Sequence, residues 1–273
     1  MTDITLTPDQ IAAFHRDGAI TVPAFASPAE VASAHSAFNA LICGALPIPG
    51  ADIGEHTPGL LNVTAFSLYH PLPSLGVLAE LDRRALRVTE QLYGEEPGAV
   101  FARDYEQLLR KLAGRPGSVF PPHWDQMYWP RSRSGAFDLR TATFSLALTP
   151  ADERNGCLWV LPGSQALKGA YAGAVTRLQG SREKGGGVIE VRVLPEDLAR
   201  RRFLPLRAGD ATFHGEWVLH GSEANRDGER SRDTLIFAYR AKRMIEVERA
   251  LGFRHSYNDA DETLRRVRTE EFE

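Results

Sequence analysis

Near the start of the chain, hydrophobic and polar positions alternate with the period of helices. Thr7-Pro8-Asp9-Gln10 and Ser27-Pro28-Ala29-Glu30 each combine a hydroxyl N-cap, a proline at the first helical position and a Gln or Glu three residues after the cap. These two capping boxes predict helices that end near Gly18 and near Leu41. The apolar residues Ala19–Val22 between them predict a short strand.

From about residue 98 the pattern changes to short apolar segments separated by turns. Before that point, leucines at helical spacing predict one more helix over residues 74–93, whereas the Pro- and Gly-rich residues 44–73 predict irregular structure. The later strand candidates are Ala99–Ala102, Tyr105–Leu112, Thr141–Leu148, Cys157–Leu161, Val188–Val193, Ala211–Phe213 and Thr234–Tyr239. Because no long helix intervenes between these segments, they favour an antiparallel sandwich or barrel over a parallel sheet with helical crossovers.

The order of the elements predicts a single domain over residues 1–273, because no linker-like segment separates the helices from the strands. We expect a helical part at about 7–95, a β core at about 98–242 and a charged tail at about 243–273. The expected fold class is therefore mainly β with flanking helices. A chain of this length can bury a core without disulfides, and two cysteines are too few for a disulfide framework.

Charge and hydropathy exclude several classes of partner. The chain has 32 basic and 35 acidic residues, so it carries no basic field for a nucleic acid or an anionic membrane. The N-terminus does not have the pattern of a signal peptide, and no apolar run approaches the ~18 residues that span a bilayer. We expect a cytoplasmic protein whose partner is a small molecule.

The candidate chemistry begins at Pro121-Pro122-His123-Trp124-Asp125. In an extended segment, residues i and i+2 face the same way, so His123 and Asp125 can present an imidazole and a carboxylate to one point. His220, which Gly221 and Ser222 follow, supplies a second imidazole from a separate strand 97 positions downstream. Two histidines and one carboxylate on one face of an ion form the facial triad of non-heme Fe(II) oxygenases. We predict His123, Asp125 and His220 as metal ligands.

Other residues near these motifs favour different roles. His214 has the same strand parity as His220 but lacks the following Gly-Ser, which favours a cavity-wall or hydrogen-bonded histidine. Trp124 has the opposite parity to the ligands and is expected in the core, whereas Tyr128 and Trp129 could line a substrate pocket.

A co-substrate of such a metal needs an anchor of its own. When 2-oxoglutarate binds a metal through its keto acid, its second carboxylate lies several carbons away, where an arginine fork can hold it. Arg232 lies at the entry to the apolar segment Thr234–Tyr239 and would be fixed on a strand, whereas Arg226 and Arg230 lie in the polar turn before it. Arg232 is therefore the predicted anchor.

The run NGCLWVLPGSQ at Asn155–Gln165 resembles the NGCL-x-x-x-PGSH signature of the phytanoyl-CoA dioxygenase family. His123-x-Asp125, the Gly209-Asp210 turn and His220-Gly221-Ser222 resemble that family's other landmarks in order. Later matches are Asn225 and the spacing of seven residues from Arg232 to Tyr239. The resemblance covers roughly residues 7 to 240.

This resemblance implies a double-stranded β-helix, or jelly roll, with N-terminal helices packed outside and Fe(II) in the mouth of the roll. The implied iron ligands are His123, Asp125 and His220, and the implied 2-oxoglutarate contacts are Arg232, Ser222 and Gln107. The loop after the distal histidine is one residue longer than usual in the family, which makes Arg230 the rival of Arg232. Halogenating relatives replace the metal carboxylate by Gly or Ala, so Asp125 favours hydroxylation.

The implied reaction is hydroxylation of an unactivated C–H bond of a small molecule, with O₂ and 2-oxoglutarate consumed and succinate and CO₂ released. Relatives act on amino-acid derivatives, natural-product intermediates and acyl thioesters. Two alternatives remain from the sequence. One is a non-catalytic jelly roll that binds a small ligand, and the other is a Zn hydrolase that uses the same His₂Asp set and has no use for Arg232.

Overall fold

The computed structural model describes residues 4–46, 52–57, 59–65, 76–129, 138–167, 169–171, 174–177 and 189–250. The helices are α1 (Pro8–Asp17), α2 (Pro28–Ile42), α3 (Gly76–Tyr93), α4 (Pro195–Leu198) and α5 (Lys242–Ala250). The strands are β1 (Ala19–Val22), β2 (Asp52–Thr57), β3 (Leu60–Ala65), β4 (Phe101–Lys111), β5 (Phe120–His123), β6 (Thr141–Ala147), β7 (Leu158–Val160), β8 (Val175–Arg177), β9 (Ile189–Val191), β10 (Arg202–Phe203), β11 (Ala211–Gly215), β12 (His220–Ser222) and β13 (Arg232–Ala241). Short 3₁₀ turns lie at Asp125–Tyr128 and Ser164–Leu167.

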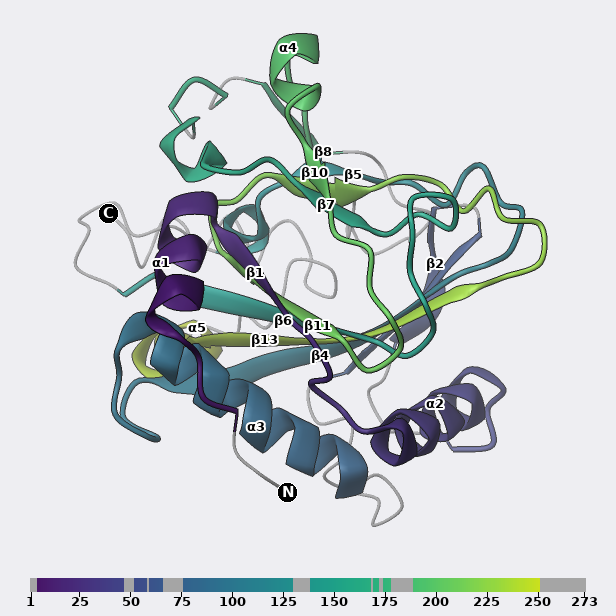
Figure 1. Cartoon of the computed structure of the whole chain (residues 1–273), viewed down its shortest axis with the longest axis horizontal. Helices are drawn as coiled ribbons and strands as arrows, with labels where there is room; N and C mark the ends of the chain where they lie inside the picture. Colours follow the sequence, from purple (N-terminus) through teal and green to yellow (C-terminus); the bar gives the residue numbers. More distant parts are fainter. Residues whose placement is uncertain are drawn as a thin grey trace.

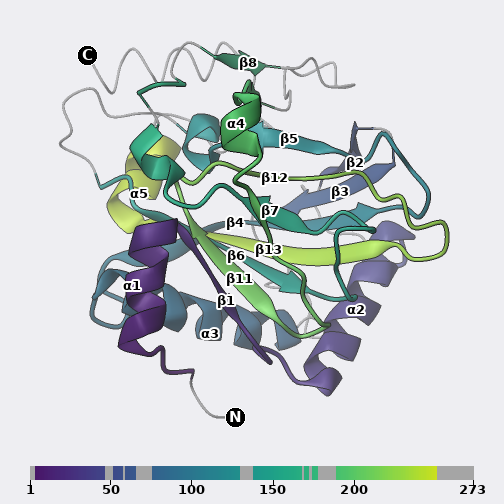
Figure 2. The same cartoon turned by 45° about the horizontal axis from the view of Figure 1, so that its top comes forward.

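Two sheets form the β part of the molecule (Figure 1). The larger has seven strands in the order β1-β11-β6-β13-β4-β3-β2, and the smaller has four in the order β10-β7-β12-β5. A separate ribbon pairs β8 with β9. Every described pairing is antiparallel. Figure 2 shows the smaller sheet as a layer over the larger one.

Helices cover the outer face of the larger sheet, as Figure 1 shows for α3. Phe38 and Leu81 from helices share one apolar cluster with Phe144, Phe213 and Phe237 from β6, β11 and β13. Because side chains alternate along a strand, these three phenylalanines face the helices while their neighbours face the other sheet. The outer face of the sheet is thus apolar, and its inner face is available for polar chemistry.

Both predicted capping boxes are confirmed. The Thr7 and Ser27 hydroxyls accept hydrogen bonds from the backbone N–H groups of Gln10 and Glu30, whose side chains bond back to the caps. Gly18 ends α1 in the left-handed region, with φ of +84°, which a glycine adopts without steric cost. Glu30 also forms a buried ion pair with Arg84 of α3, at 2.8 Å between Oε1 and Nη2.

The expectation of irregular structure over residues 44–73 is wrong for β2 and β3. These strands form a hairpin, and Leu60–Ala65 pairs with Glu106–Lys111 of β4 at the edge of the larger sheet. The local sequence does not reveal β3 because its partner β4 lies more than 40 residues away in the chain, and β2 is held in the sheet only through β3. β4 itself joins the two predicted strands 99–102 and 105–112 into one strand of 11 residues.

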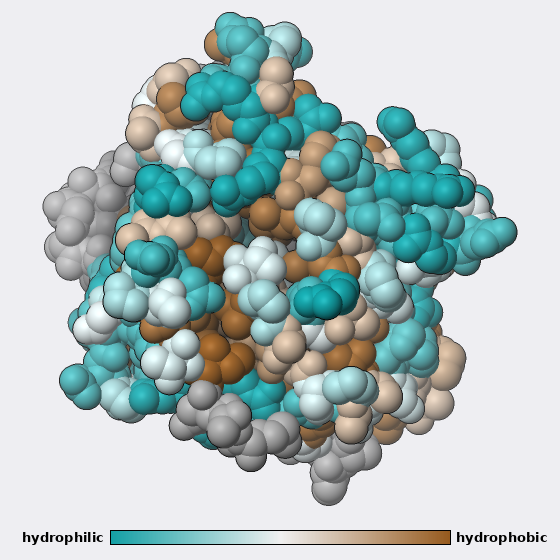
Figure 3. Space-filling model, viewed as in Figure 1, coloured by the Kyte–Doolittle hydropathy of each residue, from teal (hydrophilic) through white to brown (hydrophobic). Residues whose placement is uncertain are grey.

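The charged tail begins with helix α5, and residues 251–273 lie outside the described ranges. Among the described helices, none combines the length and the apolar character needed to cross a bilayer. The face of the molecule in Figure 3 is a patchwork of hydrophilic and hydrophobic residues.

The ion pair between Glu30 and Arg84 generates a stability prediction. Glu30→Ala removes a capping acceptor and the nearer of two carboxylates that contact the buried Arg84, since Glu80 also lies 3.8 Å from Arg84 Nη2. We therefore expect the free energy of unfolding to fall by about 2–4 kcal/mol. The control is Arg200→Ala, whose ion pair with Asp197 is exposed and should change stability by less than about 1 kcal/mol. Urea denaturation measures both variants, and equal stabilities would contradict the prediction.

Candidate active site

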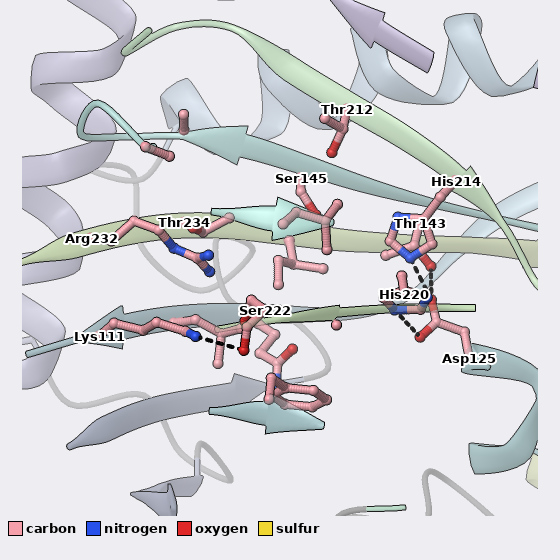
Figure 4. Close-up of a pocket in the computed structure, with 18 of the residues that line it drawn as sticks. Lys111, Asp125, Thr143, Ser145, Thr212, His214, His220, Ser222, Arg232 and Thr234 are labelled. Atoms are coloured by element: carbon pink, nitrogen blue, oxygen red, sulfur yellow. Dashed lines mark hydrogen bonds and ion pairs between the residues drawn. The ribbon is translucent and has the colours of Figure 1, made fainter. Parts of the chain in front are cut away.

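A cavity lies between the two sheets, and most of the predicted site residues line it (Figure 4). Its polar lining comes from Gln107, Lys111, His123, Asp125, Tyr128, Thr143, Ser145, Thr212, His214, His220, Ser222, Arg232 and Thr234. Its apolar lining comes from Leu60, Leu109, Phe120, Ala147, Ala151, Leu158, Leu206 and Ile236. The cavity therefore combines polar groups at defined points with walls that favour an organic ligand.

One end of the cavity holds His123, Asp125 and His220. His123 at the end of β5 pairs directly with His220 at the start of β12, and their ring centroids lie 4.1 Å apart. Asp125 Oδ1 lies 3.5 Å from His123 Nε2 and 3.3 Å from His220 Nε2. Cis ligands of an octahedral ion with bonds of about 2.1 Å lie about 3 Å apart. The donor set and its spacing fit a divalent metal.

Hydrogen bonds to the backbone fix the orientation of both histidines. Nδ1 of His123 lies 2.8 Å from the Pro121 carbonyl oxygen, and Nδ1 of His220 lies 3.0 Å from the Val218 carbonyl oxygen. A carbonyl only accepts hydrogen bonds, so each Nδ1 carries the proton and each Nε2 presents a lone pair to the cavity. Both rings are therefore in the tautomer that a metal needs.

The carboxylate of Asp125 is buried and ionised. Burial alone would raise its pKa, but the neighbouring imidazoles of His220, His214 and His123 hold the pKa well below its usual range. The other carboxylate oxygen, Oδ2, lies 3.0 Å from His214 Nε2 and accepts a hydrogen bond from the Thr143 hydroxyl at 2.5 Å. The prediction that His214 forms hydrogen bonds in the cavity wall is therefore confirmed. Thr143 was not predicted, because only the register of β6 against β11 brings it to this position.

Two buried cations occupy the other end of the cavity, where Figure 4 shows Arg232 and Lys111 beside Ser222. Arg232 of β13 pairs directly with Lys111 of β4. Arg232 donates to the carbonyl oxygen of Gly156, and Lys111 Nζ donates to the carbonyl oxygens of Ser222, at 3.2 Å, and Glu223. Neither cation forms an ion pair with any residue that the structure describes.

The electrostatics of this pair favour an anion. Burial lowers the pKa of Arg232 to about 10. Burial, with the nearby Arg232 charge, holds the pKa of Lys111 well below its usual range. Arg232 Nε is buried and has no hydrogen-bond partner in the described part of the chain. A carboxylate at this end would satisfy the free donor and offset the repulsion between the two cations.

The remaining predicted residues divide between cavity and surface. Ser222 lines the cavity, and so does Gln107, whose buried Nε2 has no hydrogen-bond partner within the described ranges. Arg230 lies outside the cavity lining, where it is 44% exposed and forms ion pairs with Asp227 and Asp152 at 2.6 and 2.9 Å.

The three aromatic residues near the metal motif differ in where their side chains lie. Trp124 lies in the core, as its strand parity predicts. Tyr128 lines the cavity, whereas Trp129 does not and instead donates from Nε1 to Asp104 at 3.0 Å.

The sequence profile of the phytanoyl-CoA dioxygenase (PhyH) family matches residues 14–234. The chain belongs to this family. The resemblance found in the sequence motifs is therefore confirmed, and the matched range includes all the candidate residues of the cavity.

The chain is also similar to a named enzyme and to several solved structures. It is 25% identical over 231 residues to the ectoine dioxygenase of Streptomyces avermitilis, which covers 81% of this chain and 74% of that protein. The structure of EctD from S. alaskensis with 2-oxoglutarate and 5-hydroxyectoine has a TM-score of 0.64 at 21% identity, and covers 88% of this chain and 77% of that one. The structure of the epimerase SnoN in complex with Fe³⁺, alpha ketoglutarate and nogalamycin RO has a TM-score of 0.62 at 22% identity. The match covers 85% of this chain and 82% of that one. These structures share the fold of the family.

The metal-binding prediction follows from the three donors. Removal of any one of them by His123→Ala, Asp125→Ala or His220→Ala should abolish binding of Co²⁺, which calorimetry measures without turnover. His15→Gln is the matched control, because His15 bonds to the Leu92 carbonyl oxygen on another part of the fold and its loss should leave binding unchanged. Wild-type affinity in a donor variant would show that the metal binds elsewhere.

Burial and the neighbouring His220 lower the pKa of His123 from 6.5 to about 4, which generates a pH prediction. Between these values the unfolded chain binds a proton that the folded, metal-free protein does not. The free energy of unfolding should therefore fall as pH drops from about 6.5 to about 4, by up to about 3 kcal/mol from His123. The lowered pKa of His214 acts in the same direction. Urea denaturation of metal-free protein across this range should show a shallower dependence in His123→Gln, and equal slopes would contradict the assignment.

Proposed function

We propose that this protein is an Fe(II)/2-oxoglutarate-dependent dioxygenase that hydroxylates an unactivated C–H bond of a small molecule. The observation that carries the proposal is the presence of a His₂Asp triad and, at the opposite end of the same cavity, a pair of buried cations that have no ion-pair partner among the described residues. A metal site alone fits several reactions. A metal site facing a buried anion site fits a co-substrate that is held at both ends.

His123, Asp125 and His220 would hold Fe(II) through two imidazole nitrogens and one carboxylate oxygen, which suits this ion. With iron, 2-oxoglutarate and O₂ bound, the site would supply the oxidising chemistry that converts 2-oxoglutarate to succinate and CO₂. The protein's part is to hold three ligands on one face, which leaves the opposite face for the co-substrates.

Arg232 would bind the distal carboxylate of 2-oxoglutarate. Its guanidinium is buried, carries a free N–H group and is fixed at the start of β13, so little order is lost on binding. Lys111 would add a second positive charge, and the Ser222 hydroxyl, which lines the same end, would add a hydrogen bond. Gln107 would donate from its free amide to the co-substrate.

The apolar walls of the cavity would exclude water from the reacting centre. Leu60, Leu109 and Ile236 form one cluster beside the cavity, and Phe120 packs against both this cluster and His123, at 4.7 Å between the rings of Phe120 and His123. Exclusion of water protects a strong oxidant from side reactions and strengthens the electrostatic contacts at both ends.

The substrate would be a small molecule such as an amino-acid derivative, a natural-product intermediate or an acyl thioester. Similarity to the ectoine dioxygenase supports oxidation of a small metabolite, and similarity to an epimerase indicates that one fold serves several outcomes. Hydroxylation is proposed because Asp125 fills the position that halogenating relatives leave free for chloride. The two facing sheets would form the double-stranded β-helix of one domain over residues 1–273.

The test is substrate-stimulated conversion of 2-oxoglutarate to succinate by the iron-loaded protein, screened over these substrate classes. Succinate formation that needs O₂ and iron supports the proposal. Absence of turnover with every class would favour the ligand-binding alternative, and hydrolysis sustained by Zn²⁺ would favour the hydrolase.

The anchor prediction compares two arginines two positions apart. Arg232→Gln should raise the KM for 2-oxoglutarate at least tenfold, because it removes a buried charge-assisted hydrogen bond, whereas Arg230→Gln should leave this KM unchanged. Where turnover is too slow, the binding of 2-oxoglutarate to the Co²⁺ form can be measured by calorimetry. A larger effect from Arg230→Gln would transfer the anchor to the rival residue.

A further inference from the structure

One oxygen of Asp125 faces the other two metal ligands, and the second oxygen faces away from them. Oδ1 lies 3.5 and 3.3 Å from the Nε2 atoms of His123 and His220. Oδ2 contacts His214 Nε2 at 3.0 Å and the Thr143 hydroxyl at 2.5 Å. Figure 4 shows His214 and Thr143 together at the end of the cavity where Asp125 lies. The carboxylate is therefore divided into a metal side and a hydrogen-bonded side.

The two donors to Oδ2 form a matched pair on the larger sheet. Thr143 of β6 and His214 of β11 are direct partners in the ladder, and both are buried. An ionised carboxylate only accepts hydrogen bonds, so His214 must carry its proton on Nε2. We call the hydrogen bonds from Thr143 and His214 to Asp125 Oδ2 the clamp. The clamp joins the larger sheet to the carboxylate of Asp125, a residue that follows β5 of the smaller sheet.

We propose that His214 and Thr143 are positioning residues that keep Asp125 bound to the metal through one oxygen. The inference rests on the proposed function of the site. With both hydrogen bonds in place, Oδ2 points away from the metal and its lone pairs are occupied. Without them, the carboxylate is free to rotate and bind the metal through both oxygens, as carboxylates do at many metal sites.

The number of metal-bound oxygens matters because the site needs open positions. Three protein ligands would leave the remaining coordination positions of the metal to 2-oxoglutarate and O₂. A second bond from Asp125 would take one of these positions. The clamp thus preserves the vacancy on which the proposed reaction depends, although neither residue is itself a ligand.

The experiment measures metal binding rather than turnover. Thr143→Val and His214→Leu each remove one hydrogen bond, while Thr143→Ser and His214→Gln retain a donor. Thr212→Val is the matched control, because this buried threonine lines the same cavity, lies on β11 with His214, and its hydroxyl has no partner in the described part of the chain. Calorimetry gives the Kd for Co²⁺, and the visible absorption spectrum of bound Co²⁺ reports the ligand geometry.

We expect Thr143→Val and His214→Leu to weaken Co²⁺ binding 10- to 100-fold, the range found when groups that orient metal ligands are removed, and to change the Co²⁺ spectrum. Thr143→Ser and His214→Gln should restore affinity and spectrum to near wild type, and Thr212→Val should match wild type. If His214→Leu fails to fold, Thr143→Val and the two conservative variants carry the test.

Two outcomes overturn different statements. In the first outcome, wild-type protein binds Co²⁺, and Thr143→Val and His214→Leu bind it with a Kd within twofold of wild type and an unchanged spectrum. This outcome overturns the clamp and leaves the proposed function intact. Wild-type protein that binds no divalent metal overturns the proposed function, and the clamp falls with it.

Discussion

The structure depends on an ionised carboxylate that is held out of water between two sheets. Burial of such a group is unfavourable unless donors surround it. Asp125 meets this condition with partners from both sheets, His123 and His220 on one side and His214 and Thr143 on the other. These contacts to a single side chain require three features at once: the side-chain alternation along β5, the register of β6 against β11, and the tautomers of the histidines. The candidate metal centre is thus also a point where the two sheets are joined.

The opposite end of the cavity carries buried positive charge instead of a buried carboxylate. Arg232 and Lys111 are buried cations held by backbone carbonyl oxygens, and the structure describes no carboxylate paired with either. The turn before β7 contributes to this end, because the carbonyl oxygen of Gly156 accepts a hydrogen bond from Arg232. Gly156 itself has a positive φ of +77°. A Cβ at Gly156 would lie 2.2 Å from the Glu223 carbonyl oxygen, so no side chain fits. A dianionic co-substrate that spans the cavity would complete both ends at once.

The sequence predicted those parts of the site that depend on short-range spacing. The i, i+2 parity of His123 and Asp125, the two capping boxes and the strand position of Arg232 needed no knowledge of distant partners. The β2–β3 hairpin and the role of Thr143 could not be predicted, because each depends on which strands lie side by side and in what register. Lys111 illustrates the same limit: it lies in the predicted strand Tyr105–Leu112, but its position opposite Arg232 comes from the pairing of β4 with β13.

The direct pairing of His123 with His220 also constrains when the protein can acquire its metal during biosynthesis. The two histidines are separated by 97 positions in the chain, and β12 is the partner of β5 in the smaller sheet. A nascent chain that has emerged only as far as β7 holds the His123 and Asp125 half of the site, and two donors bind a metal much more weakly than three. Metal loading therefore has to follow synthesis and folding of nearly the whole domain. By that stage all three donors are in place before the metal binds.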